Sequence, residues 1–390
     1  MTTIHGFADE GFGPVADAFA ANVAGGAELG AACAVRHRDR LVVDLHAGLA
    51  DARTGRAWTD GTLVVGYSVT KGLVALCAQI ARARGLLDLD APVGEIRPEF
   101  AVKGKENVRI RDLFSHRSGL MALDADLSFA DVAAWTPVVR AIERQEPLWE
   151  PGTAFAYHPL TFGWLTGEVL RRATGRTPGA LVAEWLAGPF GADAWIGLPE
   201  EQEHRVARIE PPEADPRDTA WMEAALARPA VVRSMTLGGA FPPLLIEDGH
   251  PGDLNARAAR AVEIPAAGGV LSAKALATIY AAAVTEVGGH RLLDDAGVAD
   301  ALAVRSSGES WPGALAHPDM RFSTGFMLDG IAHRPLLSDA SFGHDGATGS
   351  LGFADADAEV GFGYLNNRFG GIADERANRL TAALRRSLGS

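Results

Sequence analysis

The segment GYSVTKG, residues 66–72, places a serine three positions before a lysine. The apolar spacing that follows predicts a helix over 68–84, and positions i and i+3 of a helix share a face. Ser68 and Lys71 would then bring a hydroxyl nucleophile within reach of an amine base. Such a lysine needs its pKa lowered from about 10.4 towards 7, which burial or a second cation can supply. The plain alternative is that Ser68 caps the helix and Lys71 extends to solvent.

The elements that must position this pair come from both ends of the chain. Residues 11–24 have the apolar spacing of a helix, and residues 30–48 hold two strand-like runs joined by RHRDR, a hairpin pattern. Further strand patterns lie within 321–367 and are followed by a closing helix. The middle of the chain has mostly helical patterns. We therefore expect an α+β fold in which strands from both ends form one antiparallel sheet and a helical domain is inserted between them.

The expected boundaries follow from this division. Residues 1–85 and 286–390 would form the sheet domain, and residues 86–285 the mostly helical domain. The segment ADADAE, residues 354–359, lies between two strand patterns and is expected to be a hairpin turn. It lacks the central Gly and distal Glu of a calcium loop.

Composition restricts the partners of this 390-residue chain. With 49 Asp and Glu against 36 Lys and Arg, the net charge of −13 would repel nucleic acid and anionic membranes. No run approaches the roughly 20 apolar residues of a membrane span, and the first residues lack the pattern of a secretion signal. We therefore expect a cytoplasmic protein without a nucleic-acid or membrane partner. Nothing in the sequence indicates an oligomeric state.

The sequence gives no sign of a metal or cofactor. Cys33 and Cys77 lie among apolar neighbours, which favours buried thiols over a disulfide or a metal pair. No spacing of His and carboxylates is typical of a zinc site, and no Gly-rich run has the phosphate-loop pattern. We expect chemistry that needs no cofactor.

Several motifs together resemble the serine hydrolases of the class C β-lactamase, DD-peptidase and family VIII carboxylesterase group. After SVTK come LDLDAPVGEIRPEF, VRIRDLFSHRSGL, EPLWEPGTAFAYH, AAGGVLSA and FGHDGATGSLGFADADAEVGFGYLNN, in the order which that family uses. The resemblance runs nearly from end to end, and the joint match is specific where one piece alone is not. It implies an antiparallel sheet with flanking helices, an all-helical domain, and an active site between the two.

The resemblance also implies roles for the residues at the site. Ser68 would be the acylated nucleophile and Lys71 its partner in a proton relay. Tyr157, in FAYHP, matches the tyrosine of the family's Tyr-x-Asn motif and would lie in the helical domain. A phenolate held near an ammonium could accept the serine proton and pass it to the leaving group.

The segment HDG, residues 344–346, stands where the family has Lys-Thr-Gly, and esterase-like relatives have a His-x-Gly version there. His344 would orient an acyl or leaving-group oxygen. Gly346 would let the strand approach the substrate without a side chain in the way. The backbone N–H of Ala347, with that of Ser68, would form an oxyanion hole. Asp345 is expected to face solvent in a turn.

The chain departs from the family pattern at Pro159, which stands where the motif has Asn. An Asn amide could hydrogen-bond the side-chain amide of a β-lactam or peptide, and proline offers no donor. His158 is a candidate to replace that substrate contact. His116, in LFSHRSGL, is expected to be structural and to support the segment that carries Tyr157.

The sequence thus predicts a carboxylic ester hydrolase that acts on small to medium esters through an acyl-enzyme on Ser68. An acyltransferase and a weak β-lactamase or DD-peptidase share the same chemistry and stay as alternatives. From another class, the alternative is a catalytically silent ligand-binding relative. Covalent labelling by a fluorophosphonate would separate the two classes, because only an activated serine reacts.

Overall fold

Strands from the two ends of the chain form one antiparallel sheet in the computed structural model, which describes residues 2–213, 215–314, 319–371 and 374–389. Across the sheet the order is β1 (Ile4–Ala8), β3 (Arg40–Asp51), β2 (Gly30–His37), β13 (Val360–Asn366), β12 (Leu351–Asp355), β11 (Ser341–Asp345), β10 (Met327–Leu328), β9 (Arg321–Phe322) and β8 (Ser306–Ser307), and β4 (Arg56–Ala57) pairs with β3. The predicted α+β class and the antiparallel sheet are confirmed.

The pairing of β2 with β13 joins the N-terminal hairpin to the C-terminal strands. Val35 lies opposite Phe362, and Cys33 lies opposite Tyr364. The hairpin predicted at 30–48 is the pair β2 and β3. The turn predicted at 354–359 connects β12 to β13.

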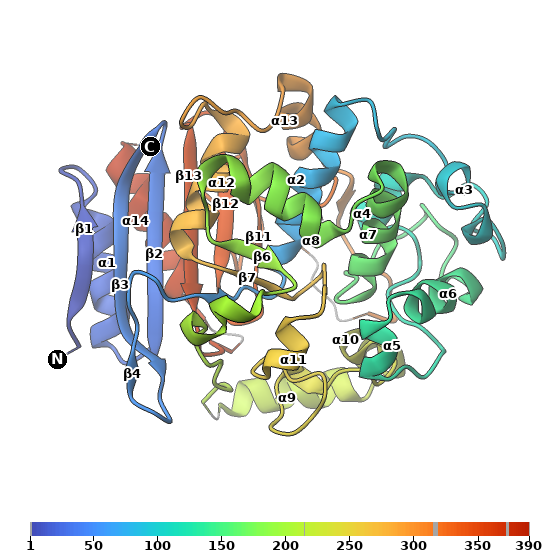
Figure 1. Cartoon of the computed structure of the whole chain (residues 1–390), viewed down its shortest axis with the longest axis horizontal. Coiled ribbons are helices and arrows are strands. Elements are labelled where there is room, and N and C mark those ends of the chain that lie inside the picture. The colour runs from blue at the N-terminus through green and yellow to red at the C-terminus, as the bar shows by residue number, and fades with distance from the viewer. Residues whose placement is uncertain (1, 214, 315–318, 372–373, 390) are drawn as a thin grey trace.

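Helices cover both faces of the sheet, as Figure 1 shows. On one face α1 (Gly13–Ala24) packs beside α14 (Arg376–Leu388). Their apolar side chains share a core with β12 and β13 that includes Val15, Phe19, Phe353, Phe362 and Leu380. On the other face lies α12 (Ala273–Val284), with α2 (Val69–Ala83) beside it against β11 and β12.

The close approach of α12 to the sheet depends on glycines. Gly361 and Gly363 are two apart on β13 and therefore face the same side. A Cβ at Gly361 would lie 2.1 Å from the carbonyl oxygen of Ala277, and one at Gly363 would lie 2.3 Å from that of Ala273. The alanine-rich face of α12 therefore rests almost directly on the backbone of β13.

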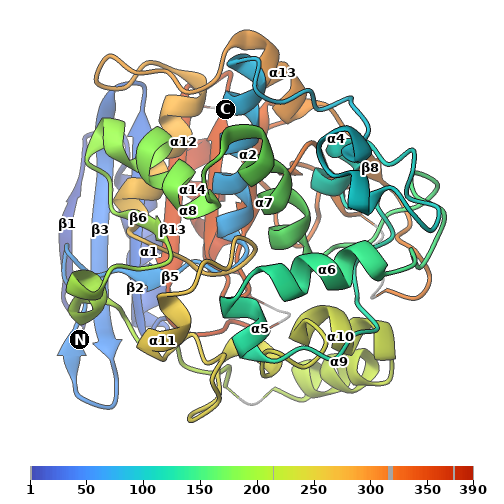
Figure 2. The same cartoon turned by 45° about the vertical axis from the view of Figure 1, so that its right-hand side comes forward.

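The middle of the chain forms mostly short helices, which lie beside α2 on its side away from the large sheet and below α2 in the view of Figure 1 (Figures 1 and 2). In chain order they are α3 (Val93–Ile96), α4 (Ile110–Phe114), α5 (Phe129–Ala133), α6 (Thr136–Arg144), α7 (Thr161–Thr174), α8 (Pro178–Leu181), α9 (Pro216–Leu226), α10 (Pro229–Thr236) and α11 (Arg257–Arg260), with α13 (Asp295–Leu302) following α12. Shorter helical turns lie at Pro98–Phe100, Val182–Ala187, Gly188–Phe190, Glu200–Arg205 and Pro243–Leu245. None of the helices described is both long and apolar enough to cross a membrane.

A small second sheet connects the middle of the chain to the start of α2. Its antiparallel strands are β5 (Val64–Val65), β7 (Gly269–Leu271) and β6 (Ala194–Ile196), with β7 in the centre. Although α12 falls within the range 86–285, it packs on the large sheet. The division into a sheet domain of 1–85 and 286–390 and a helical domain of 86–285 stays a prediction.

The close contact between α12 and β13 predicts that one methyl group added at this contact will lower the stability of the fold. Gly361→Ala should lower the free energy of unfolding by about 1–3 kcal/mol, because the new Cβ must push α12 away from the sheet. Gly13→Ala is the matched control, since a Cβ there meets nothing within 4 Å. Urea denaturation measures both. If both variants were as stable as the parent, the close packing of α12 on β13 would be wrong.

Candidate active site

Ser68 lies at the point where β5 turns into α2. The preceding Tyr67 has a φ of 50°, a left-handed conformation that costs free energy for a residue with a side chain. The Tyr67 hydroxyl donates a hydrogen bond to the carbonyl oxygen of Leu244 at 3.0 Å, and its ring packs edge-on against Phe369. The Ser68 side chain makes no capping hydrogen bond to α2. The plain alternative of a helix cap is therefore wrong, and the hydroxyl is left for other partners.

Lys71 is the second residue of the predicted pair, and it is completely buried. Its Nζ lies 3.0 Å from Ser68 Oγ, 2.8 Å from the carbonyl oxygen of Pro159 and 2.8 Å from that of Ala266. Burial lowers the pKa of Lys71 well below its usual range, and the charge of Asp345 opposes this only in part.

Nζ contacts three oxygen atoms, and it donates to the carbonyls of Pro159 and Ala266 and to Ser68 Oγ. The lowered pKa favours loss of one of these protons. A neutral amine would keep both carbonyl bonds and turn its lone pair to the Ser68 hydroxyl. An amine held in this way can take the proton of the serine as Oγ attacks.

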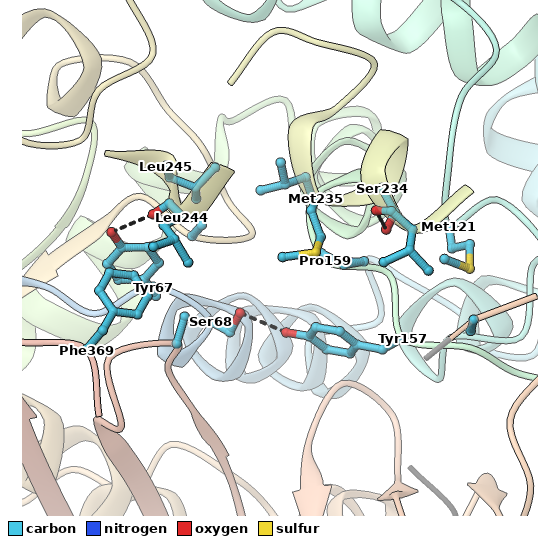
Figure 3. Close-up of a pocket in the computed structure, with 15 residues that line it drawn as sticks. Tyr67, Ser68, Met121, Tyr157, Pro159, Ser234, Met235, Leu244, Leu245 and Phe369 are labelled. Atoms are coloured by element: carbon cyan, nitrogen blue, oxygen red, sulfur yellow. Dashed lines mark hydrogen bonds between the residues drawn. The ribbon is translucent and has the colours of Figure 1, made fainter. Parts of the chain in front are cut away.

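Tyr157 completes the group around Ser68. Its hydroxyl donates to Ser68 Oγ at 2.7 Å (Figure 3). Lys71 Nζ lies 4.9 Å from the centre of its ring. Burial raises the pKa of Tyr157, the bond to Ser68 lowers it less, and the Asp345 charge raises it further. The phenolate that we expected is therefore not the resting form. Tyr157 is a neutral hydroxyl that donates to Ser68, and the base in this state is Lys71.

Gly346 brings the end of β11 against the turn that carries Ser68. A Cβ at Gly346 would lie 2.3 Å from the carbonyl oxygen of Gly66, so only glycine fits there without a shift. The following Ala347 borders the same cavities as Ser68. Within the described part of the chain, the N–H groups of Ser68 and Ala347 are not used by any other hydrogen bond. Both donors are free for a developing oxyanion.

Two cavities meet at Ser68, Tyr157 and Ala347. The first has a volume of about 290 Å³ and is mainly apolar. Figure 3 shows Met235, Leu244 and Leu245 across it from Ser68. The second has a volume of about 220 Å³, and its walls include His344, Asp345 and Gly346. A substrate carbonyl at Ser68 thus has space for one group on each side.

His158 does not lie at either cavity. It is fully buried, its Nε2 is 2.9 Å from Ser118 Oγ, and its Nδ1 is 2.6 Å from the carbonyl oxygen of Ala156. Because both ring nitrogens are used inside the protein, the predicted substrate contact of His158 is wrong. Pro159, by contrast, matters through its carbonyl bond to Lys71 and through its ring, which lines the first cavity.

His116 contacts the segment around Tyr157 through both its backbone carbonyl and its ring. Its carbonyl oxygen accepts from the N–H of Ala156 at 3.2 Å, and its Nδ1 accepts from the N–H of His158 at 3.2 Å. The ring centre lies 5.0 Å from that of Tyr157. Burial lowers the pKa of His116 well below its usual range, so the ring is neutral and Nδ1 can accept. These contacts agree with the supporting position expected for His116, and its role stays a prediction.

Asp345 is not the solvent-facing turn residue that we expected. It is the last residue of β11, its carboxylate borders the second cavity, and Arg334 Nε lies 3.6 Å away. His344, beside it, borders the same cavity, and its ring centre lies 5.9 Å from that of Tyr157. The structure therefore places His344 and Gly346 at the site, as expected, and adds Asp345.

Sequence reasoning missed Tyr67 and Ala266. Ala266 contributes only a carbonyl oxygen, which no side-chain pattern can reveal, although it lies in the matched segment AAGGVLSA. The strain at Tyr67 appears only in the backbone angles. Cys33 and Cys77 are free and buried, as predicted. Among the described residues, no three or more His, Cys, Asp or Glu side chains are grouped to hold a metal ion.

The chain is similar in sequence and in structure to several known proteins. Residues 15–386 match the family Beta-lactamase. Esterase/beta-lactamase LipL of Mycobacterium tuberculosis is 32% identical over 379 residues, which cover 94% of this chain and 83% of that protein. A family VIII carboxylesterase of known structure is 35% identical with a TM-score of 0.87, covering 99% of this chain and 100% of that one. A penicillin-binding protein homolog from Caulobacter crescentus is 31% identical with a TM-score of 0.83, with the same coverage.

The contacts of His116 predict that it positions Tyr157. His116→Leu should slow fluorophosphonate labelling of Ser68 by about tenfold or more, because it leaves the buried N–H of His158 without an acceptor at a cost of about 1–3 kcal/mol. His116→Asn should retain more of the labelling rate. Its side-chain oxygen can take the place of Nδ1, and Asn tolerates the φ of 64° found there. Equal labelling rates in the parent and both variants would contradict this role.

Proposed function

The chain belongs to the beta-lactamase family, and we propose that it is a serine ester hydrolase which cleaves small to medium carboxylic esters through an acyl-enzyme on Ser68. The observation that carries this proposal is the set of hydrogen bonds that joins Ser68 Oγ to a buried lysine and to a tyrosine. The carboxylesterase and esterase relatives of similar length support the reaction class.

Acylation begins with proton transfer from Ser68 to Lys71. The neutral amine faces Oγ, and its other two contacts are fixed, so it needs no rearrangement to accept the proton. As Oγ bonds to the ester carbon, negative charge develops on the carbonyl oxygen. The free N–H groups of Ser68 and Ala347 would hold that oxygen, and each such donor is worth about 3–4 kcal/mol in a transition state.

Tyr157 then serves the leaving group. Its neutral hydroxyl donates a proton to the departing alcohol oxygen, and the Lys71 ammonium returns a proton to Tyr157. The Asp345 charge favours this order, because it stabilises the Lys71 ammonium and opposes a Tyr157 phenolate. Deacylation repeats the steps with water as the nucleophile, and Lys71 with Tyr157 takes its proton.

The cavity walls support esters over β-lactams. A penicillin or cephalosporin carries a side-chain amide that needs a hydrogen-bond partner, and an unpaired buried amide costs about 1–3 kcal/mol. Pro159 lines the first cavity, and its side chain has no hydrogen-bonding group to offer. A short acyl chain has no such requirement and gains from the apolar wall of Met121, Val231 and Leu245.

Acyl transfer is the second candidate. It uses the same acyl-enzyme, with an alcohol in place of water. The observation in its favour is the apolar first cavity beside Ser68, since apolar walls favour an organic alcohol over water. A silent ligand-binding protein is disfavoured, because Ser68, Lys71 and Tyr157 are joined as a working group.

A turnover screen tests the proposed reaction. Nitrophenyl esters with acyl chains of about two to six carbons should be hydrolysed with a kcat/KM far above that for a chromogenic cephalosporin. Ser68→Ala should abolish ester turnover and fluorophosphonate labelling, while costing about 1–3 kcal/mol of stability because the Tyr157 hydroxyl loses its acceptor. Added alcohols would reveal acyl transfer as ester products. Full activity in Ser68→Ala, or a cephalosporin that matches the best ester, would refute the assignment.

Lys71 and Tyr157 should behave as one unit. Lys71→Ala and Tyr157→Phe should each lower kcat by about two orders of magnitude or more, and the double variant should be little worse than the poorer single one. The reason is that neither residue can pass on the proton without the other. Steady-state kinetics with a nitrophenyl ester measures all three variants. Losses that multiply in the double variant would show that the two residues act independently.

A further inference from the structure

The second cavity differs in chemistry from the first. It lies on the β11 side of Ser68 and has a polar wall at the end of that strand. Much of the rest of its surface comes from phenylalanine, tyrosine and methionine side chains, with Ser310 and His333 also in the lining. The lining residues are Ser68, Phe155, Tyr157, Ser310, Met320, Phe322, Met327, His333, His344, Asp345, Gly346 and Ala347.

Asp345 supplies a negative charge to this wall. Burial works against its ionised form, but the nearby His344 Nδ1, 3.6 Å from Oδ1, and the charge of Arg334 outweigh it and hold the pKa of the carboxyl below its usual range. The Arg334 side chain is 8% exposed and lies outside the cavity lining, whereas that of Asp345 is 27% exposed and borders the cavity. A substrate in the second cavity therefore contacts Asp345 and not Arg334.

His344 adds a second acceptor to the same wall. Its Nδ1 lies 2.8 Å from the carbonyl oxygen of Asp345, which only accepts, so Nδ1 carries the proton. In the neutral ring, Nε2 then holds a lone pair. Nε2 is buried and has no hydrogen-bond partner within the described residues. A buried nitrogen of this kind calls for a donor from a ligand.

Aromatic rings form another part of the cavity lining. Tyr157 and Phe322 are stacked with their ring centres 5.9 Å apart and their planes 12° from parallel, and Phe155 lies edge-on to Phe322. Aromatic faces attract cations and give nothing to anions. A carboxylate, an acceptor nitrogen and aromatic rings together favour a positively charged group that donates hydrogen bonds or presents methylated nitrogen.

We propose that the second cavity binds a cationic group of the substrate and that Asp345 determines this specificity. The preferred substrates are esters with an apolar part in the first cavity and an ammonium-bearing part in the second. Substrates that bring a carboxylate to this wall are disfavoured by Asp345. This proposal rests on the proposed ester hydrolysis at Ser68.

Esters matched in shape and different in charge test the proposal. Choline butyrate and its neutral carbon analogue 3,3-dimethylbutyl butyrate place the difference in the alcohol. Nitrophenyl esters of 4-(trimethylammonio)butanoate and 5,5-dimethylhexanoate place it in the acyl group. In at least one pair, the cationic ester should have a kcat/KM about tenfold above its neutral analogue, the scale of a desolvated cation against aromatic faces. That pair also identifies which part of the substrate enters the second cavity.

Asp345→Asn should reduce this preference to about threefold or less. The ratio within each pair is the readout, because a partly unfolded sample lowers both rates equally. Asp295→Asn is the control: it removes the same charge from a side chain that is 93% exposed on α13, and it should leave the ratio unchanged. Added salt should weaken the preference in the parent enzyme.

The outcomes separate this proposal from the proposed function. If Ser68→Ala retained ester turnover, the proposed function itself would fail. If all four esters were cleaved through Ser68 without a cationic preference in either pair, only the specificity proposal would fail. A preference that survived in Asp345→Asn would assign it to the aromatic rings and would overturn the role of Asp345.

Discussion

The burial of one lysine amine is the constraint on which the site depends. Lys71 Nζ is enclosed by α2 and by the carbonyl groups of Pro159 and Ala266, which come from separate parts of the chain. Burial makes the ammonium form costly there and lowers the pKa of Lys71, which favours loss of a proton beside Ser68. The bonds from Nζ to the two carbonyls connect α2 to the segment that carries Tyr157 and to the segment before β7. The Lys71 amine thus serves both the proposed chemistry and the packing of these segments.

Close contact between backbones is the second requirement, and glycines provide it twice. Gly346 lets the end of β11 lie against the carbonyl of Gly66, which brings the N–H of Ala347 to the side of Ser68. Gly361 lets α12 rest on β13. In both places a methyl group would meet backbone, which cannot rotate away as a side chain can. The N–H groups proposed as oxyanion donors are therefore positioned by packing of main chain against main chain.

At position 159 and at the end of β11, backbone atoms serve the proposed reaction and side chains shape the cavities that select the substrate. At position 159 the carbonyl oxygen fixes Lys71, whichever side chain is present, while the proline ring shapes the first cavity. At the end of β11 the backbone supplies the oxyanion donor, while the side chains of His344 and Asp345 face the second cavity. The side chains can therefore change without disturbing the relay. This explains how an ester hydrolase fits within a family named for β-lactam cleavage.

The sequence by itself determined the α+β class, the strands at both ends and the pair Ser68 and Lys71, because these depend on apolar periodicity and on spacing along one helix. Motif order added Tyr157, His344, Gly346 and Ala347. Only the tertiary structure decided the directions in which the pKa values of Lys71 and Tyr157 shift, since their burial depends on distant segments. It also placed His158 inside the protein and Asp345 at a cavity, because the neighbours of a side chain are set by which segments pack together. The strain at Tyr67 and the carbonyl of Ala266 have no side-chain pattern, so only the folded chain could reveal them.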